Sequence, residues 1–114
     1  MAALMHIQDI FDRDRTTFSF EFFPPKSDDA AEDLFRNIDE LEALHPSFVS
    51  VTYGAGGTTR ERTHDLVVRL KENTAVDPVP HLTCVGHAEF EISDILTRYA
   101  QHGISNIHAL GGDI

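Results

Sequence analysis

The sequence predicts an α/β fold built on a parallel sheet. From residue 16 onward, strand-like segments alternate with amphipathic helical segments, and each strand-like segment is polar on one face and apolar on the other. This alternation is typical of parallel strands joined by crossover helices. No long linker, low-complexity segment or internal repeat interrupts it, so the 114 residues are expected to form one unit.

The first segments predict a short helix followed by a strand. Apolar residues recur at helical spacing over residues 4–12, which predicts an amphipathic helix. Residues 16–22 alternate in polarity as a strand does, and the strand must stop at Pro24 because proline cannot donate to a sheet ladder. Glu21 therefore stands at the carboxyl end of this strand, either as a solvated edge carboxylate or as a functional group.

The next two units repeat the strand and helix order. Ser27 is a suitable cap for a helix whose apolar stripe continues to Leu44 and stops before Pro46. Residues 48–52 then predict a second strand, and residues 59–73 predict a second crossover helix with Leu66, Val67 and Leu70 on its apolar face.

The last part of the chain predicts two further strands around one helix. Residues 79–84 form the third predicted strand, and apolar residues from Phe90 to Tyr99 predict a helix that stops at Gly103. Residues 105–110 form the fourth predicted strand.

The polar rows of the strands favour a barrel over an open sheet. An open sheet covered by helices on both sides needs two apolar faces. Here one face of every predicted strand is polar, as expected for strands that line an interior site. These residues are Thr17, Ser19 and Glu21, then Ser50 and Thr52, then His81 and Thr83, then Asn106 and His108.

We therefore predict the first four βα units of a (βα)8 barrel, preceded by the short helix. Barrel sites lie at the carboxyl ends of the strands, where Glu21, Thr52 and Asp113 fall. A complete barrel has eight strands and about 250 residues. Residues 1–114 are expected to be its N-terminal half, with the remainder absent, and the open sheet edges are expected to promote association.

Composition narrows the classes of partner and compartment. No apolar run approaches the roughly 20 residues of a membrane span, and the start of the chain lacks the basic region of a signal peptide. The single cysteine, Cys84, fits a reducing compartment, so a cytoplasmic location is expected. With 19 acidic and 9 basic residues the net charge is -10, which disfavours nucleic acid and anionic membranes as partners.

Two local patterns allow more than one interpretation. The glycine-rich residues 54–59 could cradle a phosphate, but they lack the last glycine of a dinucleotide fingerprint and the lysine of a P-loop, so a plain loop is favoured. His81, Cys84 and His87 superficially resemble metal ligands. Because His81 and Cys84 are three residues apart on a strand, they are expected to face opposite sides, and no metal site is predicted.

The remaining charged residues and histidines are assigned to the surface. His45, His64 and His102 fall on or near predicted helix ends and are expected to be exposed. The charged side chains of the second crossover helix are expected to form a solvated face with pairs four residues apart: Arg60, Glu61, Arg62, Asp65 and Arg69.

Several segments, in order along the chain, resemble the 5,10-methylenetetrahydrofolate reductase family. They cover most of the chain after residue 16, and the first and fourth are the most specific. The segments are residues 18–26 (FSFEFFPPK), 48–55 (FVSVTYGA), 62–64 (RTH), 80–84 (PHLTC) and 109–113 (ALGGD).

The resemblance implies a flavin-containing barrel that reduces methylenetetrahydrofolate to methyltetrahydrofolate, with NADH or NADPH reducing FAD in a ping-pong cycle. Glu21 matches the family's general acid, which protonates the folate and opens its five-membered ring. Thr52, Tyr53 and Ala55 match positions at the nicotinamide and flavin, and His81 matches a flavin contact.

The resemblance extends to the end of the chain with one departure. Leu110, Gly111 and Gly112 match flavin-binding positions, and Asp113 matches an aspartate near both flavin and folate. The family usually has Arg where Gly111 stands, so the contact that an arginine makes with the flavin is lost here.

Three functional hypotheses follow from the residues and the resemblance. The first is a folate reductase that forms a homo-oligomer when complete, of which this chain alone binds flavin weakly and is inactive. The second is a non-catalytic half-barrel module that associates with a partner chain. The third is a phosphate-binding α/β protein that uses residues 54–59.

Overall fold

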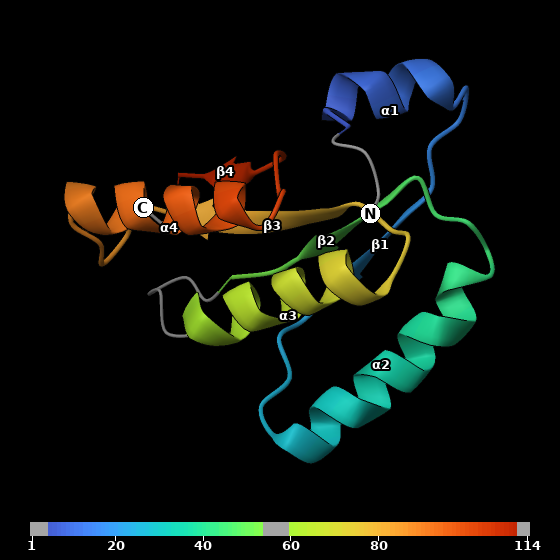
Figure 1. Ribbon diagram of the computed structural model, residues 1–114, viewed down its shortest axis with the longest axis horizontal. Helices are drawn as coiled ribbons and strands as arrows, with labels where there is room; N and C mark the ends of the chain where they lie inside the picture. Colours follow the sequence, from blue (N-terminus) through green and yellow to red (C-terminus); the bar gives the residue numbers. More distant parts are fainter. Residues whose placement is uncertain (1–4, 54–59, 112–114) are drawn as a thin grey trace.

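The computed structural model describes residues 5–53 and 60–111. Its centre is a four-stranded parallel sheet in which the strands follow one another in chain order (Figure 1). The strands are β1 (Ser19–Phe22), β2 (Phe48–Val51), β3 (Pro78–Thr83) and β4 (His108–Leu110). The helices of the described residues are α1 (Ile7–Arg13), α2 (Asp28–Glu42), α3 (Arg60–Asn73) and α4 (Glu89–Gln101).

The strand order is the one expected for consecutive units of a barrel. In a doubly wound open sheet the strand order reverses at a switch point, and helices cover both faces. Here β1 pairs with β2, β2 with β3 and β3 with β4. The sheet is therefore consistent with part of a (βα)8 barrel. None of the helices in the described ranges is long and apolar enough to cross a membrane.

The three crossover helices bury the apolar face of the sheet. Val49 and Val51 of β2 are almost fully buried and lie in one cluster with residues of α2, α3 and α4. The cluster also contains Phe22, Leu82, Phe35, Ile38, Leu66, Val67, Leu70, Ile95 and Tyr99. The buried apolar residues of β1, β2 and β3 thus face the helices, which leaves the polar rows on the opposite side, whereas Cys84 and Ala109 are exposed.

Two prolines in the central strand β3 are accommodated by its direction of hydrogen bonding. The carbonyl of Asp77 accepts from the Val49 backbone N–H at 3.0 Å. Because the N–H and C=O of successive residues point to opposite neighbouring strands, the backbone groups of every second residue from Asp77 onward point to β2. Pro78 and Pro80 therefore face the β4 side. Pairing with β4 begins only at His81, opposite His108, so the missing N–H groups cost no ladder bond.

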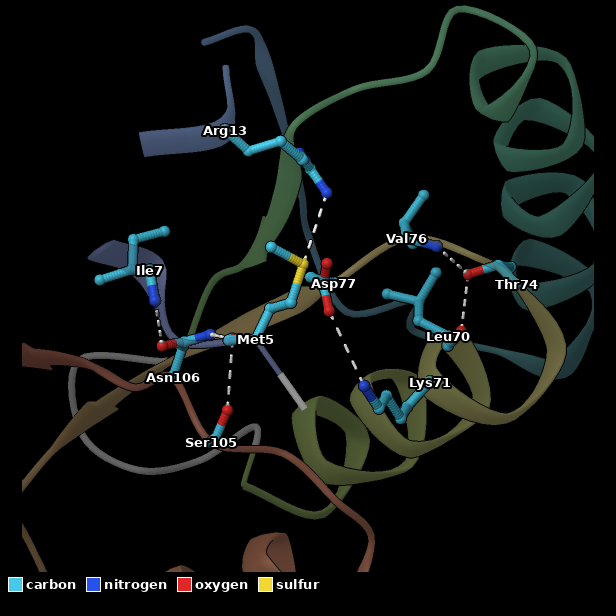
Figure 2. A network of polar contacts seen from close by, with 10 residues as sticks. All are labelled: Met5, Ile7, Arg13, Leu70, Lys71, Thr74, Val76, Asp77, Ser105 and Asn106. Carbon is cyan, nitrogen blue, oxygen red and sulfur yellow. Dashed lines mark hydrogen bonds and ion pairs between the residues drawn. The ribbon is translucent and has the colours of Figure 1, made fainter. Parts of the chain in front are cut away.

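Helix α1 stands apart from the crossover helices and is tied to the start of the last strand (Figures 1 and 2). The side-chain amide of Asn106 accepts from the Ile7 backbone N–H at 2.8 Å and donates to the Met5 carbonyl at 2.7 Å. Ile10 of α1 is fully buried, and Phe11 packs edge-on against Phe48 at the start of β2. Residues 5–13 thus lie at the amino ends of the strands.

Turn hydrogen bonds and an ion pair at the end of α3 connect that helix to β3 (Figure 2). Thr74 Oγ1 donates to the Leu70 carbonyl at 2.6 Å and accepts from the Val76 backbone N–H at 3.3 Å. Lys71 Nζ lies 3.7 Å from Asp77 Oδ1, and both side chains are largely buried. This turn therefore fixes where β3 begins.

The ends of several elements differ from the sequence prediction. The first strand was predicted from residue 16 but begins at Ser19, because its partner β2 begins at Phe48, opposite Ser19. Phe18 consequently lies outside the strand, and its side chain is 71% exposed instead of belonging to the apolar row.

Helix α2 and strand β4 are also shorter than predicted. Helix α2 ends at Glu42, and the chain then makes a turn that leaves Leu44 exposed and His45 with a φ of 53°. Strand β4 begins at His108 and not at residue 105, because Asn106 is bonded to the segment before α1. The helix predicted over residues 4–12 is α1, which runs from Ile7 to Arg13.

Candidate active site

Four polar side chains from four neighbouring strands share the face of the sheet that the crossover helices leave uncovered. Glu21 of β1 pairs in register with Ser50 of β2, which pairs with Val79 of β3. His81 stands two residues beyond Val79 on the same face and pairs with His108 of β4. The parallel register thus brings Glu21, Ser50, His81 and His108 into one polar row.

One oxygen of the Glu21 carboxyl makes both polar contacts within this row. The hydroxyl of Ser50 donates to Glu21 Oε1 at 3.1 Å. His81 Nε2 lies 3.1 Å from the same Oε1 atom, but this contact does not have the geometry of a hydrogen bond. The Glu21 side chain is 51% exposed on this uncovered face.

His81 is buried and neutral near pH 7. Burial lowers the pKa of His81, the neighbouring His108 ring lowers it further, and Glu21 acts in the opposite direction. The two imidazole rings pack edge to face with centroids 4.5 Å apart. Since the pKa lies below its ordinary value of about 6.5, the contact with Glu21 joins a carboxyl group and a neutral imidazole near pH 7.

The two site residues after β2 differ in the contacts that they make. Thr52 directly follows β2, and its carbonyl accepts from the Thr63 hydroxyl of α3 at 2.9 Å. Tyr53 is buried among the core residues on the helix side of the sheet, with its hydroxyl 2.5 Å from His87 Nε2. Any contact of Tyr53 with a ligand on the polar face would therefore be made through its backbone.

The site residues predicted near the end of the chain are only partly described. Leu110 is the last residue of β4 and is 38% exposed, and Gly111 follows it in open space, with no atom within 4 Å of where a Cβ would stand. Ala55, Gly112 and Asp113 lie outside the described residues, as does the whole glycine-rich segment of residues 54–59.

His64 was predicted to lie at the surface, and this prediction is wrong. It is only 8% exposed, and its ring packs against Tyr99 of α4 at a centroid distance of 5.1 Å. Burial lowers the pKa of His64, and the nearby Arg98 adds to the effect. His64 stands one helical turn before the buried Val67, but this spacing alone does not reveal the contact with Tyr99 that covers it. His45 and His102 are exposed as predicted.

Glu61, Arg62 and Asp65 of α3 are exposed, as predicted for a solvated face, and several charged side chains of α3 also contact neighbouring segments. Arg62 donates to the Pro25 carbonyl at 2.8 Å, Arg69 lies over the Phe35 ring at 3.7 Å, and Arg98 of α4 reaches Glu61 at 3.5 Å. These contacts join α3 to its neighbours in sequence and space. They therefore hold adjacent βα units together.

The side chains of the polar row offer oxygen and nitrogen atoms that could bind a metal ion or an organic cofactor. Across the described ranges, no group of three or more His, Cys, Asp or Glu side chains is arranged to hold a metal ion. His81 Nε2 is buried and has no hydrogen-bond partner among the described residues. An imidazole nitrogen that lacks a hydrogen-bond partner suits a polar atom of a flat heterocycle such as a flavin, and rotation of the ring would expose it, so the residues present fit that cofactor.

The comparison with protein families decides the assignment of the chain. A family model described as methylenetetrahydrofolate reductase matches residues 6–114. The chain belongs to the methylenetetrahydrofolate reductase family. The resemblance predicted from short segments is thereby confirmed over nearly the whole chain.

Individual relatives of the methylenetetrahydrofolate reductase family support the same assignment. The chain is 45% identical over 100 residues to the 5,10-methylenetetrahydrofolate reductase of Pectobacterium carotovorum, covering 88% of this chain and 34% of that protein. It is 44% identical over 96 residues to the protein of the same name from Escherichia coli, covering 84% of this chain and 32% of that protein. A probable methylenetetrahydrofolate reductase (NADH) of Oryza sativa is 38% identical over 113 residues, which are 99% of this chain and 19% of that protein.

The chain thus spans about a third of the length of the bacterial relatives and about a fifth of the plant one. Ser50, like His108, is a residue of the polar row to which the sequence assigned no role of its own. It was placed there by strand alternation alone. The strand register, which pairs Ser50 with Glu21, supplies the missing information.

Proposed function

We propose that these 114 residues form the N-terminal half of the (βα)8 barrel of a methylenetetrahydrofolate reductase. The reaction is the reduction of 5,10-methylenetetrahydrofolate to 5-methyltetrahydrofolate, with FAD as cofactor and NADH or NADPH as reductant. The observation that carries the proposal is the Glu21 carboxyl, located near the carboxyl end of β1 and held through Oε1 by Ser50. Barrel enzymes place their reacting groups at this end of the sheet.

Glu21 acts as the general acid. Its protonated carboxyl gives a proton to a ring nitrogen of the folate, the bond between that nitrogen and the methylene carbon breaks, and an electrophilic iminium carbon is left on the substrate. FAD, when bound, supplies the hydride that this carbon takes up. Proton and hydride together account for the two-electron reduction.

The other proposed site residues bind and orient the flavin and the folate. His81 carries a neutral Nε2 without a hydrogen-bond partner among the described residues, and this nitrogen would bond a polar atom of the flavin once rotation of the ring exposes it. Thr52 and Tyr53 directly follow β2, and Tyr53 would contact the flavin or nicotinamide through its backbone because its side chain lies in the core. Ala55 is proposed to contact the same groups. Leu110, Gly111 and Gly112 would contact the flavin, and Asp113 would contact both the flavin and the folate, as the family resemblance implies.

The proposal extends to the state of the whole protein. The complete barrel is a cytoplasmic homo-oligomer that binds neither nucleic acid nor membrane. The 114 residues alone bind FAD weakly and have no reductase activity, because half of the barrel wall is missing and the Glu21 side chain is 51% exposed.

Glu21→Gln in the complete, FAD-loaded barrel tests the general-acid role. Reduction of the flavin by NADH or NADPH should keep its rate, since this half-reaction needs no proton from Glu21. Reoxidation of the reduced flavin by methylenetetrahydrofolate should slow by about 10² to 10⁴, the usual contribution of a general acid.

The two half-reactions are followed separately by the flavin absorbance in a stopped-flow instrument. Glu40→Gln is the matched control, since Glu40 is an exposed residue of α2 and the same charge is removed away from the site. Unimpaired folate-dependent reoxidation of the flavin in Glu21→Gln would refute the general-acid role.

A further inference from the structure

We propose that Ser50 is a positioning residue that fixes the Glu21 carboxyl through Oε1, so that the proton leaves from Oε2. This inference rests on the proposed function, because it assigns the way in which the general acid is held. Ser50 lies in the matching segment 48–55, but the family resemblance assigns it no role.

The two strands that carry Ser50 and Glu21 are held in register on both sides of the pair. Before the pair, the Ser47 backbone N–H donates to the Phe18 carbonyl at 2.8 Å. After it, the Thr52 backbone N–H donates to the Phe22 carbonyl at 3.0 Å. Because both strand backbones are fixed, the 3.1 Å bond from Ser50 to Glu21 depends only on side-chain rotation.

The contacts of the carboxyl group are asymmetric. Both nearby polar atoms, Ser50 Oγ and His81 Nε2, lie 3.1 Å from Oε1 of Glu21. In a protonated carboxyl group the carbonyl oxygen is the stronger acceptor, so the hydrogen bond at Oε1 favours the proton on the other oxygen, Oε2. The arrangement therefore determines which oxygen is the acid.

Without the serine hydroxyl, the remaining contact with His81 lacks hydrogen-bond geometry. A glutamate side chain that is half exposed then rotates among several rotamers, and the acid spends less time in the reactive orientation. The loss falls on the proton-transfer step and not on substrate binding. The signature is a lower rate at saturating folate with little change in the folate concentration needed for half saturation.

The test compares Ser50→Ala, Ser50→Thr and Ser19→Ala in the complete, FAD-loaded barrel. Ser19→Ala is the matched control, because it removes an exposed hydroxyl from the same face of β1 two residues before Glu21. Ser50→Ala should slow folate-dependent flavin reoxidation about tenfold, the effect of losing one hydrogen bond to a carboxyl group. Flavin reduction by NADH or NADPH should be unchanged, and Ser50→Thr, which keeps the hydroxyl and suits a strand, should restore the rate.

A second readout needs no turnover. With glutamate labelled at the carboxyl carbon, the Glu21 signal in the NMR spectrum of the flavin-free protein is the one that disappears in Glu21→Gln. That signal should move in Ser50→Ala, return toward its original position in Ser50→Thr and stay in place in Ser19→Ala.

Failure of this inference is distinguishable from failure of the proposed function. A Ser50→Ala rate equal to that of the parent, beside a Glu21→Gln variant that has lost folate reduction, overturns the role of Ser50 alone. Equal slowing of both half-reactions in Ser50→Ala also overturns it, since this indicates damage to the flavin site. A fully active Glu21→Gln variant overturns the proposed function and the inference together.

Discussion

Asn106→Ala should loosen helix α1 from the sheet and lower the free energy of unfolding. The Asn106 side chain bonds to the backbone on both sides of residue 6, about 100 positions earlier in the chain (Figure 2). Alanine removes both hydrogen bonds and leaves the Ile7 N–H, in the first turn of α1, without its acceptor.

The expected loss in the free energy of unfolding follows from these two hydrogen bonds. They measure 2.8 and 2.7 Å, are partly buried, and each contributes about 1 kcal/mol net. Asn106→Ala should therefore lower the free energy of unfolding by about 2 kcal/mol. Asn106→Asp keeps the acceptor for Ile7 but loses the donor to the Met5 carbonyl, so its loss should be about half as large.

Urea unfolding of the purified protein, followed by circular dichroism, measures both differences. Asn37→Ala is the control, because Asn37 is exposed on α2 and alanine there is expected to be neutral or slightly stabilising. A loss below about 0.5 kcal/mol in Asn106→Ala, the range of ordinary surface substitutions, would refute the reasoning. Equal stability of the Asp variant and the parent would show that the donor bond contributes nothing.

Two further substitutions test features outside the polar row. The pKa of His64 is lowered in the folded protein, so below about pH 6.5 the unfolded state binds more protons than the folded state. The free energy of unfolding therefore declines as the pH falls, until the folded pKa is passed. His64→Phe should flatten the dependence of the unfolding midpoint on pH between about 7 and 5, and an unchanged slope would contradict this account. Gly111→Arg should fit without strain, since a Cβ meets no atom within 4 Å. In the complete barrel it should lower the Kd for FAD by restoring the arginine that the family usually carries, and equal or weaker FAD binding measured by fluorescence titration would argue against an arginine contact here.

The alternation of elements and the faces of the strands could be predicted because both depend on local periodicity. Ser27 accepts from the Ala30 backbone N–H at 3.1 Å as the predicted helix cap. Val49 and Val51 point to the helices while Ser50 points away, as period-two alternation requires.

Strand lengths could not be predicted, because a strand extends only as far as a partner pairs with it. The start of β1 depends on where β2 begins, and the start of β4 depends on a contact between Asn106 and a segment 100 residues away. The burial of His64 depends on where Tyr99 of α4 packs, which helical periodicity alone does not reveal. The meeting of Ser50 and His81 at one oxygen of Glu21 likewise depends on the registers of three strands.

The two prolines of β3 also protect the sheet against misalignment. If β4 slid by two residues toward the start of β3, the position of Leu82, which has a backbone N–H, would be taken by Pro80, which has none. The shifted ladder would lose a hydrogen bond, so the alternative pairing is disfavoured. Pro78 and Pro80, which take no part in the proposed reaction, thereby help to keep His81 opposite His108. The start of β3 thus contributes to the alignment of the polar row near its end.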